Sequence, residues 1–242
     1  MGAAPEISQA KPPTCNVCGG LTFQPFRRRI TARCADCGSM ERTRLLKIIL
    51  DQGDFLKRGQ TVFHAAPEPG IGRFIKGVVG DGYEAYDLNP RMFPADLEVR
   101  DFDLITDTPG LPSEKYDIVL HSHVMEHLPC DIVSVMWHLH RSLKPDGKHI
   151  FCVPILPGYY ASDFGDLTPI QRNERFSQFD HVRRFGALDF DKILGMAFNL
   201  RRFDISPAIK EKFESYAIPA NSASKLDSNT FFILGKEDLK LR

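Results

Sequence analysis

The chain has 242 residues, of which 43% are hydrophobic and 26% are charged, with 31 basic and 31 acidic side chains. This composition describes a globular protein long enough for one full α/β domain with a small appendage, or for two modest domains. The balanced charge excludes the net positive field that favours wholesale phosphate-backbone binding, and no stretch approaches the roughly 18 apolar residues of a membrane span, so we expect a soluble cytoplasmic protein for which a nucleic-acid partner is a minority interpretation.

The first 40 residues combine a polar tail with a dense group of cysteines. Residues 1–12 are polar, without the apolar core of a secretion signal, and are predicted to be a disordered tail. Two C-x2-C pairs follow, Cys15 with Cys18 and Cys34 with Cys37. In a cytoplasmic protein, four thiolates in two tight knuckles are typical of a closed structural Zn²⁺ site rather than of disulfides. The spacing therefore predicts a zinc ribbon at 13–40, with chance pairs of free thiols as the alternative.

The segment between the cysteine pairs, LTFQPFRRRITAR, alternates apolar and polar residues and predicts a short hairpin. Its arginine run at 27–29 is by default a solvated edge, and a phosphate or RNA contact is the alternative. Four apolar residues at helical spacing follow between 45 and 50, with Ser39 as a candidate N-cap and Gly53 as a stop. We expect a connecting helix within 41–57 that packs on the ribbon.

From residue 60 onward, short apolar runs alternate with helical periods. Strands are predicted at 61–66, 83–86, 117–121, 149–153, near 198–205 and at 230–235, and helices near 70–79, 131–143 and 187–196. Such alternation builds βαβ units and a mostly parallel sheet covered on both faces. Ligands of these sheets bind beyond the carboxyl ends of the strands, so the residues just after each predicted strand are the candidates for a binding site.

Acidic residues follow two of the predicted strands. Asp87 comes 23 residues after His64, which fits the acidic residue that hydrogen-bonds ribose hydroxyls in dinucleotide folds. A solvated Asp in a turn is the alternative. Asp103 stands where an adenine amino group is often held, although acidic residues at strand ends are common.

The stretch from 115 to 154 carries a resemblance to a known family. It contains YDIVL, then Glu126-His127, a predicted helix, and LKPDG before the next strand, and in this order the string is similar to the class I, type 11-like S-adenosylmethionine-dependent methyltransferases. The resemblance covers about 60 to 235 and places the domain at 58–238. It implies a Rossmann-like fold with a mostly parallel seven-stranded sheet and helices on both faces.

The first motif of that family departs from its usual form in this chain. His64 falls on the position of a carboxylate, Ala66 and Glu68 fall on glycine positions, and Gly70 matches. HAAPEPG nevertheless resembles the H-x-A-P-E version of a bacterial subgroup that also carries amino-terminal C-x2-C pairs, an ERxR stretch like 41–44 and a DHVR-x-(F/Y)-G motif like 180–186. The resemblance implies a working S-adenosylmethionine site. Its cofactor-binding residues are then His64, Ala66, Glu68, Gly70, Asp87, Leu88, Asp103 and His121.

The loop after the fourth strand carries the candidates for acid/base chemistry, His123, Glu126 and His127. Methyl transfer needs alignment of the acceptor and, for a hydroxyl or ammonium acceptor, a base. His123 and His127 are four residues apart and on a helical turn would face the same way, as a pair of possible bases or metal ligands. Packing and capping of the next helix is the alternative for Glu126 and His127.

A long connection from 154 to 186 mixes aromatic and basic residues. Long loops in compact domains are commonly lids or binding loops, and an aromatic wall with an anionic clamp is expected here, with a surface salt-bridge network as the alternative. The predicted substrate-binding residues are Tyr159, Tyr160, Arg175, Asp180, His181 and Arg183.

These features favour a methyltransferase acting on a small anionic metabolite, such as a natural-product or sugar intermediate, with an O, N or S acceptor undecided. An RNA methyltransferase whose ribbon docks RNA is the runner-up, and a non-catalytic zinc-ribbon adaptor with a methyltransferase-like domain is the other alternative. The expected cofactors are S-adenosylmethionine and structural Zn²⁺. The sequence does not indicate an oligomeric state.

Overall fold

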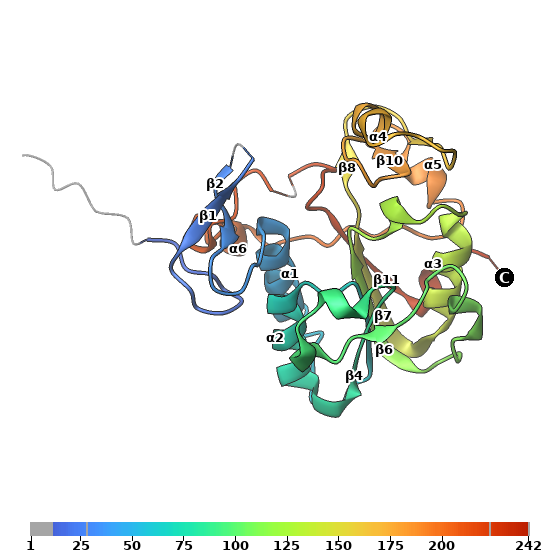
Figure 1. Cartoon of the computed structure of the whole chain (residues 1–242). Coiled ribbons are helices and arrows are strands. Elements are labelled where there is room, and N and C mark those ends of the chain that lie inside the picture. The colour runs from blue at the N-terminus through green and yellow to red at the C-terminus, as the bar shows by residue number, and fades with distance from the viewer. Residues whose placement is uncertain (1–11, 28, 223, 242) are drawn as a thin grey trace, which may run out of the picture.

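The computed structural model describes residues 12–27, 29–222 and 224–241. The predicted tail at 1–12 therefore lies, apart from its last residue, outside the described residues. An amino-terminal hairpin stands at one side of a larger α/β body (Figure 1). No helix within the described part of the chain is long and apolar enough to cross a bilayer.

The hairpin consists of β1 (Phe23–Phe26) and β2 (Arg29–Cys34), paired antiparallel with Phe23 opposite Cys34. The alternation that predicted it is present, but most of its side chains are exposed, because only Ala32 and Cys34 are buried in β2. The hairpin therefore has almost no apolar core of its own.

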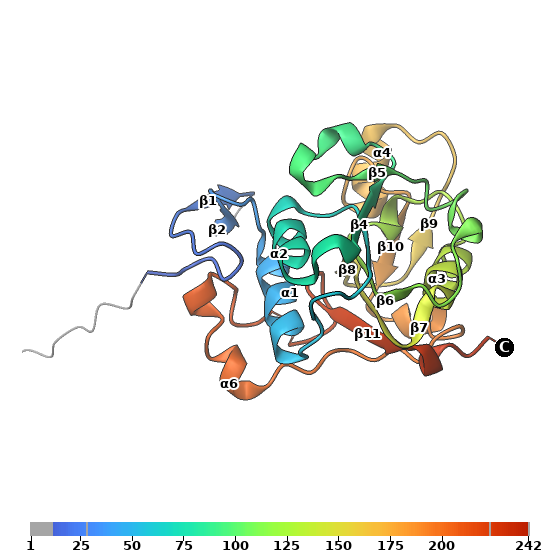
Figure 2. The same cartoon turned by 90° about the horizontal axis from the view of Figure 1, so that it is seen from below.

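Helix α1 (Glu41–Gln52) joins the hairpin to the rest of the chain and is shorter than the predicted segment 41–57. It begins after Met40, not after the predicted Ser39, and ends at Gly53 as expected. Figure 2 shows α1 between the hairpin and the sheet, with α6 (Pro207–Lys210) on the hairpin's side of the molecule. The leucines and isoleucines of α1 belong to one continuous apolar cluster with residues of the main sheet.

The main sheet has six strands in the order β11-β7-β6-β3-β4-β5. Their bounds are β3 Val62–Ala65, β4 Tyr83–Asp87, β5 Arg100–Asp101, β6 Tyr116–Ser122, β7 Leu143–Cys152 and β11 Phe231–Gly235. Only β11 runs antiparallel to its neighbour. Helices α2 (Pro69–Val79) and α1 cover one face, and α3 (Ile132–Arg141) and α5 (Phe190–Ile193) cover the other. The predicted Rossmann-like α/β class is confirmed.

The sheet differs from the expectation in two strands, because β5 (Arg100–Asp101) was not predicted and one predicted strand is absent. The predicted strand near 198–205 is wrong, since this segment makes only isolated bridges, Phe198 with Leu239 and Arg202 with Phe232. It runs beside β11 through two backbone hydrogen bonds, from Phe203 to Phe231 and from Ile233 to Arg201. The sheet therefore has six strands instead of seven.

The long connection after β7 is folded rather than open. It contains β8 (Ile155–Leu156), β9 (Ala161–Ser162), α4 (Pro169–Phe176) and β10 (Arg183–Gly186), with the three strands in a small sheet of order β8-β10-β9. Short 3₁₀ turns lie at Gly80–Gly82, Pro90–Met92, Ala95–Leu97, Thr108–Gly110, Met125–His127, Glu214–Tyr216 and Lys236–Asp238. The small sheet sits above the carboxyl ends of the main strands (Figure 1).

Candidate functional site

The strand order reverses between β3 and β6, which are paired with Ala65 opposite His121. In doubly wound sheets such a reversal opens a crevice beyond the carboxyl ends of the two strands. The chain leaves β3 at Ala66 with φ +48° and turns after β6 at His123 with φ +56°. Both residues hold a left-handed conformation, so each strand ends in a sharp turn at the edge of the crevice.

The turn after β3 contains the variant motif predicted from the sequence. The Ala66 N–H donates to the carbonyl of Tyr86 at 2.8 Å. The Glu68 carboxylate pairs with Arg42 at 2.7 Å and accepts a hydrogen bond from the Thr43 hydroxyl. The Glu68 carboxylate is thus held by two residues of α1, and both belong to the ERxR stretch at 41–44.

Gly70 opens α2 in direct contact with the second cysteine knuckle. A Cβ atom at this position would lie 3.1 Å from the Cβ, carbonyl oxygen and Sγ of Cys37. Glycine allows this close packing, because a larger residue would need the knuckle to shift by a few tenths of an ångström. Gly70, which was predicted to bind the cofactor, therefore also makes a close packing contact with Cys37.

His64 is buried in β3, with 2% of its surface exposed, and its Nδ1 lies 3.0 Å from the Tyr83 hydroxyl. Burial lowers the pKa of this imidazole to about 3. The side chain is on the face of the sheet covered by α1 and α2, because its strand neighbour Val62 belongs to that cluster. His64 does not line either of the described cavities.

The buried imidazole of His64 predicts a pH dependence of stability. The unfolded pKa of about 6.5 exceeds the folded value, so stability present above pH 6.5 is lost as the pH falls toward 3, by about 1.4 kcal/mol per pH unit for this group. We expect His64→Gln to flatten the slope of unfolding free energy against pH between 6.5 and 4 by about that amount. Urea unfolding at stepped pH measures it. The control is His138→Gln: the pKa of this half-buried imidazole is also lowered, but the shift is smaller, so this variant should flatten the slope less than His64→Gln does. An unchanged slope in His64→Gln would contradict the assignment.

Asp87, Leu88 and Asp103 lie at the ends of β4 and β5. The Asp87 carboxylate accepts the N–H of Asn89 at 2.7 Å and is half-buried, and the Leu88 side chain is 61% exposed. The Asp103 carboxylate accepts the N–H of Ile105 at 2.8 Å, within its own turn. Asp87 and Leu88 thus present a carboxylate and an apolar side chain side by side at the strand ends.

His121 lies inside the protein rather than at the crevice. It is fully buried, stacks on Phe151, and its Nε2 is 3.0 Å from Nε2 of His149. Burial lowers the pKa of His121 to about 3 and that of His149 well below its ordinary value. One of the two neutral rings can donate to the other through Nε2, while the Nδ1 atoms of both rings have no hydrogen-bond partner among the described residues.

A cavity of about 880 Å³ lies between the hairpin and the carboxyl end of the sheet. Four arginines line it, Arg27, Arg29, Arg33 and Arg42. Four residues of the opposite wall are His123, Glu126, His127 and His181. We refer to this cavity as the ribbon cleft. It brings the three predicted acid/base residues together with Glu68 and with His181.

Glu126 is the centre of this wall. Its side chain is wholly buried, and neither carboxylate oxygen has a hydrogen-bond partner among the described residues. Burial raises the pKa of Glu126 to about 8. The nearest imidazole nitrogens are His123 Nδ1 at 3.4 Å and His127 Nε2 at 4.0 Å from its Oε1.

His123 is held by a backbone carbonyl on the far side of its ring. Its Nε2 lies 2.9 Å from the carbonyl oxygen of Ser228, so Nε2 carries the proton and Nδ1 is left as an acceptor toward Glu126. Burial lowers the pKa of His123 to about 3. The ring is therefore neutral at physiological pH.

The predicted substrate residues separate into three groups. Tyr159, Tyr160 and Arg175 line a second cavity of about 610 Å³. Asp180 contacts His127 and His181 lines the ribbon cleft. The guanidinium of Arg183 is buried and donates to the carbonyls of Leu128 and, at 2.6 Å, Cys130. These residues do not converge on one clamp.

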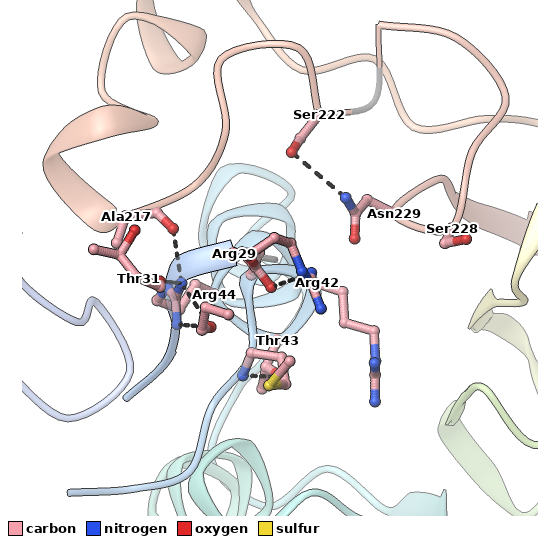
Figure 3. Close-up of polar contacts among 12 residues, drawn as sticks. Arg29, Thr31, Arg42, Thr43, Arg44, Ala217, Ser222, Ser228 and Asn229 are labelled. Carbon is pink, nitrogen blue, oxygen red and sulfur yellow. Dashed lines mark hydrogen bonds and ion pairs between the residues drawn. The ribbon is translucent and has the colours of Figure 1, made fainter. Parts of the chain in front are cut away.

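The sequence reasoning did not select several residues of the ribbon cleft. Arg42 extends from α1 on the side away from Arg44 (Figure 3). Ser228 and Asn229, from the segment before β11, also line the cleft. Arg42 could have been predicted as a site residue, because it belongs to the ERxR stretch. No sequence pattern indicates that 228–229 lines the cleft.

The four cysteines meet at one end of the hairpin, as predicted, with Cys34 at the end of β2 and the other three in the flanking segments. Sγ of Cys15 is 3.7 Å from that of Cys37, and Sγ of Cys18 is 3.6 Å from that of Cys34. Zn–S bonds of about 2.3 Å place tetrahedral sulfurs about 3.8 Å apart. The hydrogen bond from Cys37 is the main cause that lowers the pKa of Cys15, to about 4. This set is suited to a structural Zn²⁺ ion.

Comparisons with known proteins are consistent with this fold. A family model described as a methyltransferase domain matches residues 66–200. Similar solved structures include an S-adenosylmethionine-dependent methyltransferase from Archaeoglobus fulgidus (16% identity, 79% of this chain, 92% of that chain, TM-score 0.47). Another is phosphoethanolamine N-methyltransferase 2 from Haemonchus contortus with S-adenosyl-L-methionine (17% identity, 78% of this chain, TM-score 0.47), of whose length this chain spans 51%. No curated protein matches the sequence.

Proposed function

The chain belongs to the methyltransferase domain family and is an S-adenosylmethionine-dependent methyltransferase, and from this premise we propose that it methylates a small anionic acceptor bound in the ribbon cleft. The observation that carries the proposal is the cleft itself, about 880 Å³ in volume, with four arginines on one wall and histidines at the carboxyl end of β6 on the other. Arginine guanidinium groups bind carboxylates and phosphates with paired hydrogen bonds.

The cofactor would lie in the crevice beyond β3, β4 and β6, next to the cleft. Asp87 is suited to the ribose hydroxyls, because its half-buried carboxylate retains acceptor capacity beside its bond to Asn89. Leu88 offers exposed apolar surface to a base, and Glu68 offers a carboxylate to an amino group. When bound, S-adenosylmethionine supplies a methyl group on a sulfonium sulfur.

The role proposed for Asp87 predicts a loss of cofactor affinity on its removal. We expect Asp87→Ala to weaken S-adenosylmethionine binding at least about tenfold, on the order of 1.4 kcal/mol. Isothermal titration of the purified protein measures this change. Asp81→Ala is the matched control, since Asp81 is exposed in the turn at the opposite end of β4, and equal affinities for the two variants would remove the ribose assignment.

His123, Glu126 and His127 would face the acceptor. The Nδ1 atom of His123 is an unprotonated acceptor of a hydrogen bond, because its Nε2 donates to Ser228. A buried neutral imidazole orients a hydroxyl or ammonium group and excludes water from it, while its low pKa makes it a weak base. An acceptor that is already ionised, such as a carboxylate or thiolate, needs no base at this position.

The anionic class of the acceptor predicts that Arg42 contributes to binding. A hydrogen bond from a charged donor contributes about 1.5–3 kcal/mol, so Arg42→Met should weaken the binding of inorganic pyrophosphate about tenfold or more. Titration of the protein saturated with S-adenosylhomocysteine measures this. Arg58→Met removes an exposed arginine outside the cleft and should leave the affinity unchanged, and an equal loss in both variants would indicate general charge attraction.

Two experiments test the proposed function as a whole. Isothermal titration with S-adenosylmethionine and S-adenosylhomocysteine should give binding of both. Incubation with methyl-labelled cofactor should then label an anionic small-molecule fraction of a cell extract. Labelling of RNA with a steep salt dependence would favour the RNA methyltransferase instead, and cofactor binding without transfer to any fraction would favour the adaptor.

A further inference from the structure

A second group of metal-ligating side chains lies in the wall of the ribbon cleft. Glu126, His127 and His181 each offer one ligand atom, and these atoms lie within 4.8 Å of one another. Glu126 and His127 come from the 3₁₀ turn after β6, and His181 comes from the segment between α4 and β10. We propose that these three residues bind a divalent transition-metal ion, such as Zn²⁺ or Fe²⁺, separate from the ion of the four cysteines.

The Glu126 side chain is the strongest indication of a cation-binding site. It is wholly buried, and both carboxylate oxygens lack a hydrogen-bond partner in the described part of the chain. Buried polar groups are nearly always paired, and an unpaired buried carboxylate is costly. A metal ion bound to Glu126 would satisfy this carboxylate.

His127 is oriented as a metal ligand. Its Nδ1 is 3.3 Å from the carbonyl oxygen and 3.5 Å from the carboxylate of Asp180. The Nδ1–H group donates to Asp180, which leaves the Nε2 lone pair directed toward Glu126. A histidine that donates one nitrogen to a carboxylate or carbonyl and offers the other to the ion is the usual arrangement at metal centres.

His181 is the third proposed ligand and comes from the segment between α4 and β10. His181 is buried, with 6% of the residue exposed, and its ring meets the His127 ring edge to face, with centroids 4.8 Å apart and an interplanar angle of 88°. One carboxylate and two imidazoles suit Zn²⁺ and Fe²⁺ and leave coordination positions open. All three residues line the ribbon cleft, so an open position can take an oxygen ligand from a molecule bound there.

The ligand chemistry separates this site from the ribbon site. Four thiolates give bound cobalt an intense sulfur-to-metal charge-transfer absorption, whereas nitrogen and oxygen ligands give only weak visible bands. The full-length protein with zinc in its ribbon is therefore titrated with Co²⁺ without cofactor or acceptor. We expect one Co²⁺ per chain with visible bands and no thiolate charge transfer, together with retained ribbon zinc by metal analysis. The proposed methyl transfer plays no part in this measurement.

Matched variants test the assignment of the ligands. Glu126→Gln and His181→Asn should abolish binding of the additional Co²⁺ ion, and Asp180→Asn should weaken it about tenfold through its effect on His127. His138→Asn removes a histidine of α3 outside the cleft and should bind Co²⁺ like the wild type. A wild-type protein that binds no additional ion, or ligand variants that bind it as tightly as the wild type, would overturn the proposal. If a ligand variant fails to fold, the Asp180→Asn and His138→Asn pair decides.

Discussion

Removal of the metal from the four-cysteine cluster is expected to unfold the hairpin. Of the residues in β1 and β2, only Ala32 and Cys34 are buried, so apolar burial contributes little to the stability of this segment. Structural zinc sites in peptides of this size supply about 10–16 kcal/mol of apparent binding free energy, which is also their folding free energy. This is the largest single effect that we expect in the molecule.

The measurement compares metal content with local order. Purified protein should hold one zinc per chain that resists dialysis against EDTA, and Cys34→Ser should lose it, with rapid hydrogen exchange across residues 13–40. Cys130→Ser is the matched control, because Cys130 is half-buried and lies outside the cluster. Protein that retains slow exchange in the hairpin after complete zinc removal would contradict a metal-dependent ribbon.

Substitution of Arg44 by methionine is expected to lower the free energy of unfolding by at least about 3 kcal/mol. The Arg44 guanidinium is fully buried and donates to the carbonyls of Thr31, Ala32, Ser39 and Ala217, at 2.7 Å in the last two (Figure 3). Each hydrogen bond to a charged group contributes about 1.5–3 kcal/mol, and the carbonyls left without a donor add to the loss.

Urea unfolding measures the effect of Arg44→Met, with Lys47→Met on the same helix as its control. Lys47 makes an i,i+4 pair with the exposed Asp51, and such helix pairs contribute about 0.3–0.5 kcal/mol. The Lys47 stem, which methionine largely replaces, packs beside Phe74. A loss in Arg44→Met no larger than that of the control would show that the four carbonyls find other donors.

Local patterns predicted the elements but not every contact between them. The apolar/polar alternation between the cysteine pairs sufficed for the hairpin. Short apolar runs sufficed for β3, β4, β6 and β11 because each is bounded by its own turn residues. The segment at 198–205 has a similar apolar pattern but borders β11 through only two hydrogen bonds. Pairing of this kind depends on register with a distant strand, which a local pattern does not contain.

The residues of the candidate site that lie directly at the ends of strands were predictable from the sequence. His123 and Asp87 are found in this way, since their positions depend on the strands that carry them. Arg42 and Ser228 enter the ribbon cleft through tertiary packing. The composition of the connection at 154–186 predicted an anion clamp, but Arg183 binds two backbone carbonyls instead, and composition alone does not distinguish these partners.

Cys37 contacts Gly70, so the expected zinc site and the proposed cofactor site are adjacent although their residues are far apart in the sequence. The Cys37 knuckle, which is expected to bind the metal, packs against the first turn of α2, next to the crevice proposed for the cofactor. If zinc strengthens the binding of cofactor by some factor, thermodynamic reciprocity requires that bound cofactor strengthen the retention of zinc by the same factor. Saturation with S-adenosylhomocysteine should then slow the chelator-driven release of zinc from the cysteines, so that metal loss reports on cofactor occupancy.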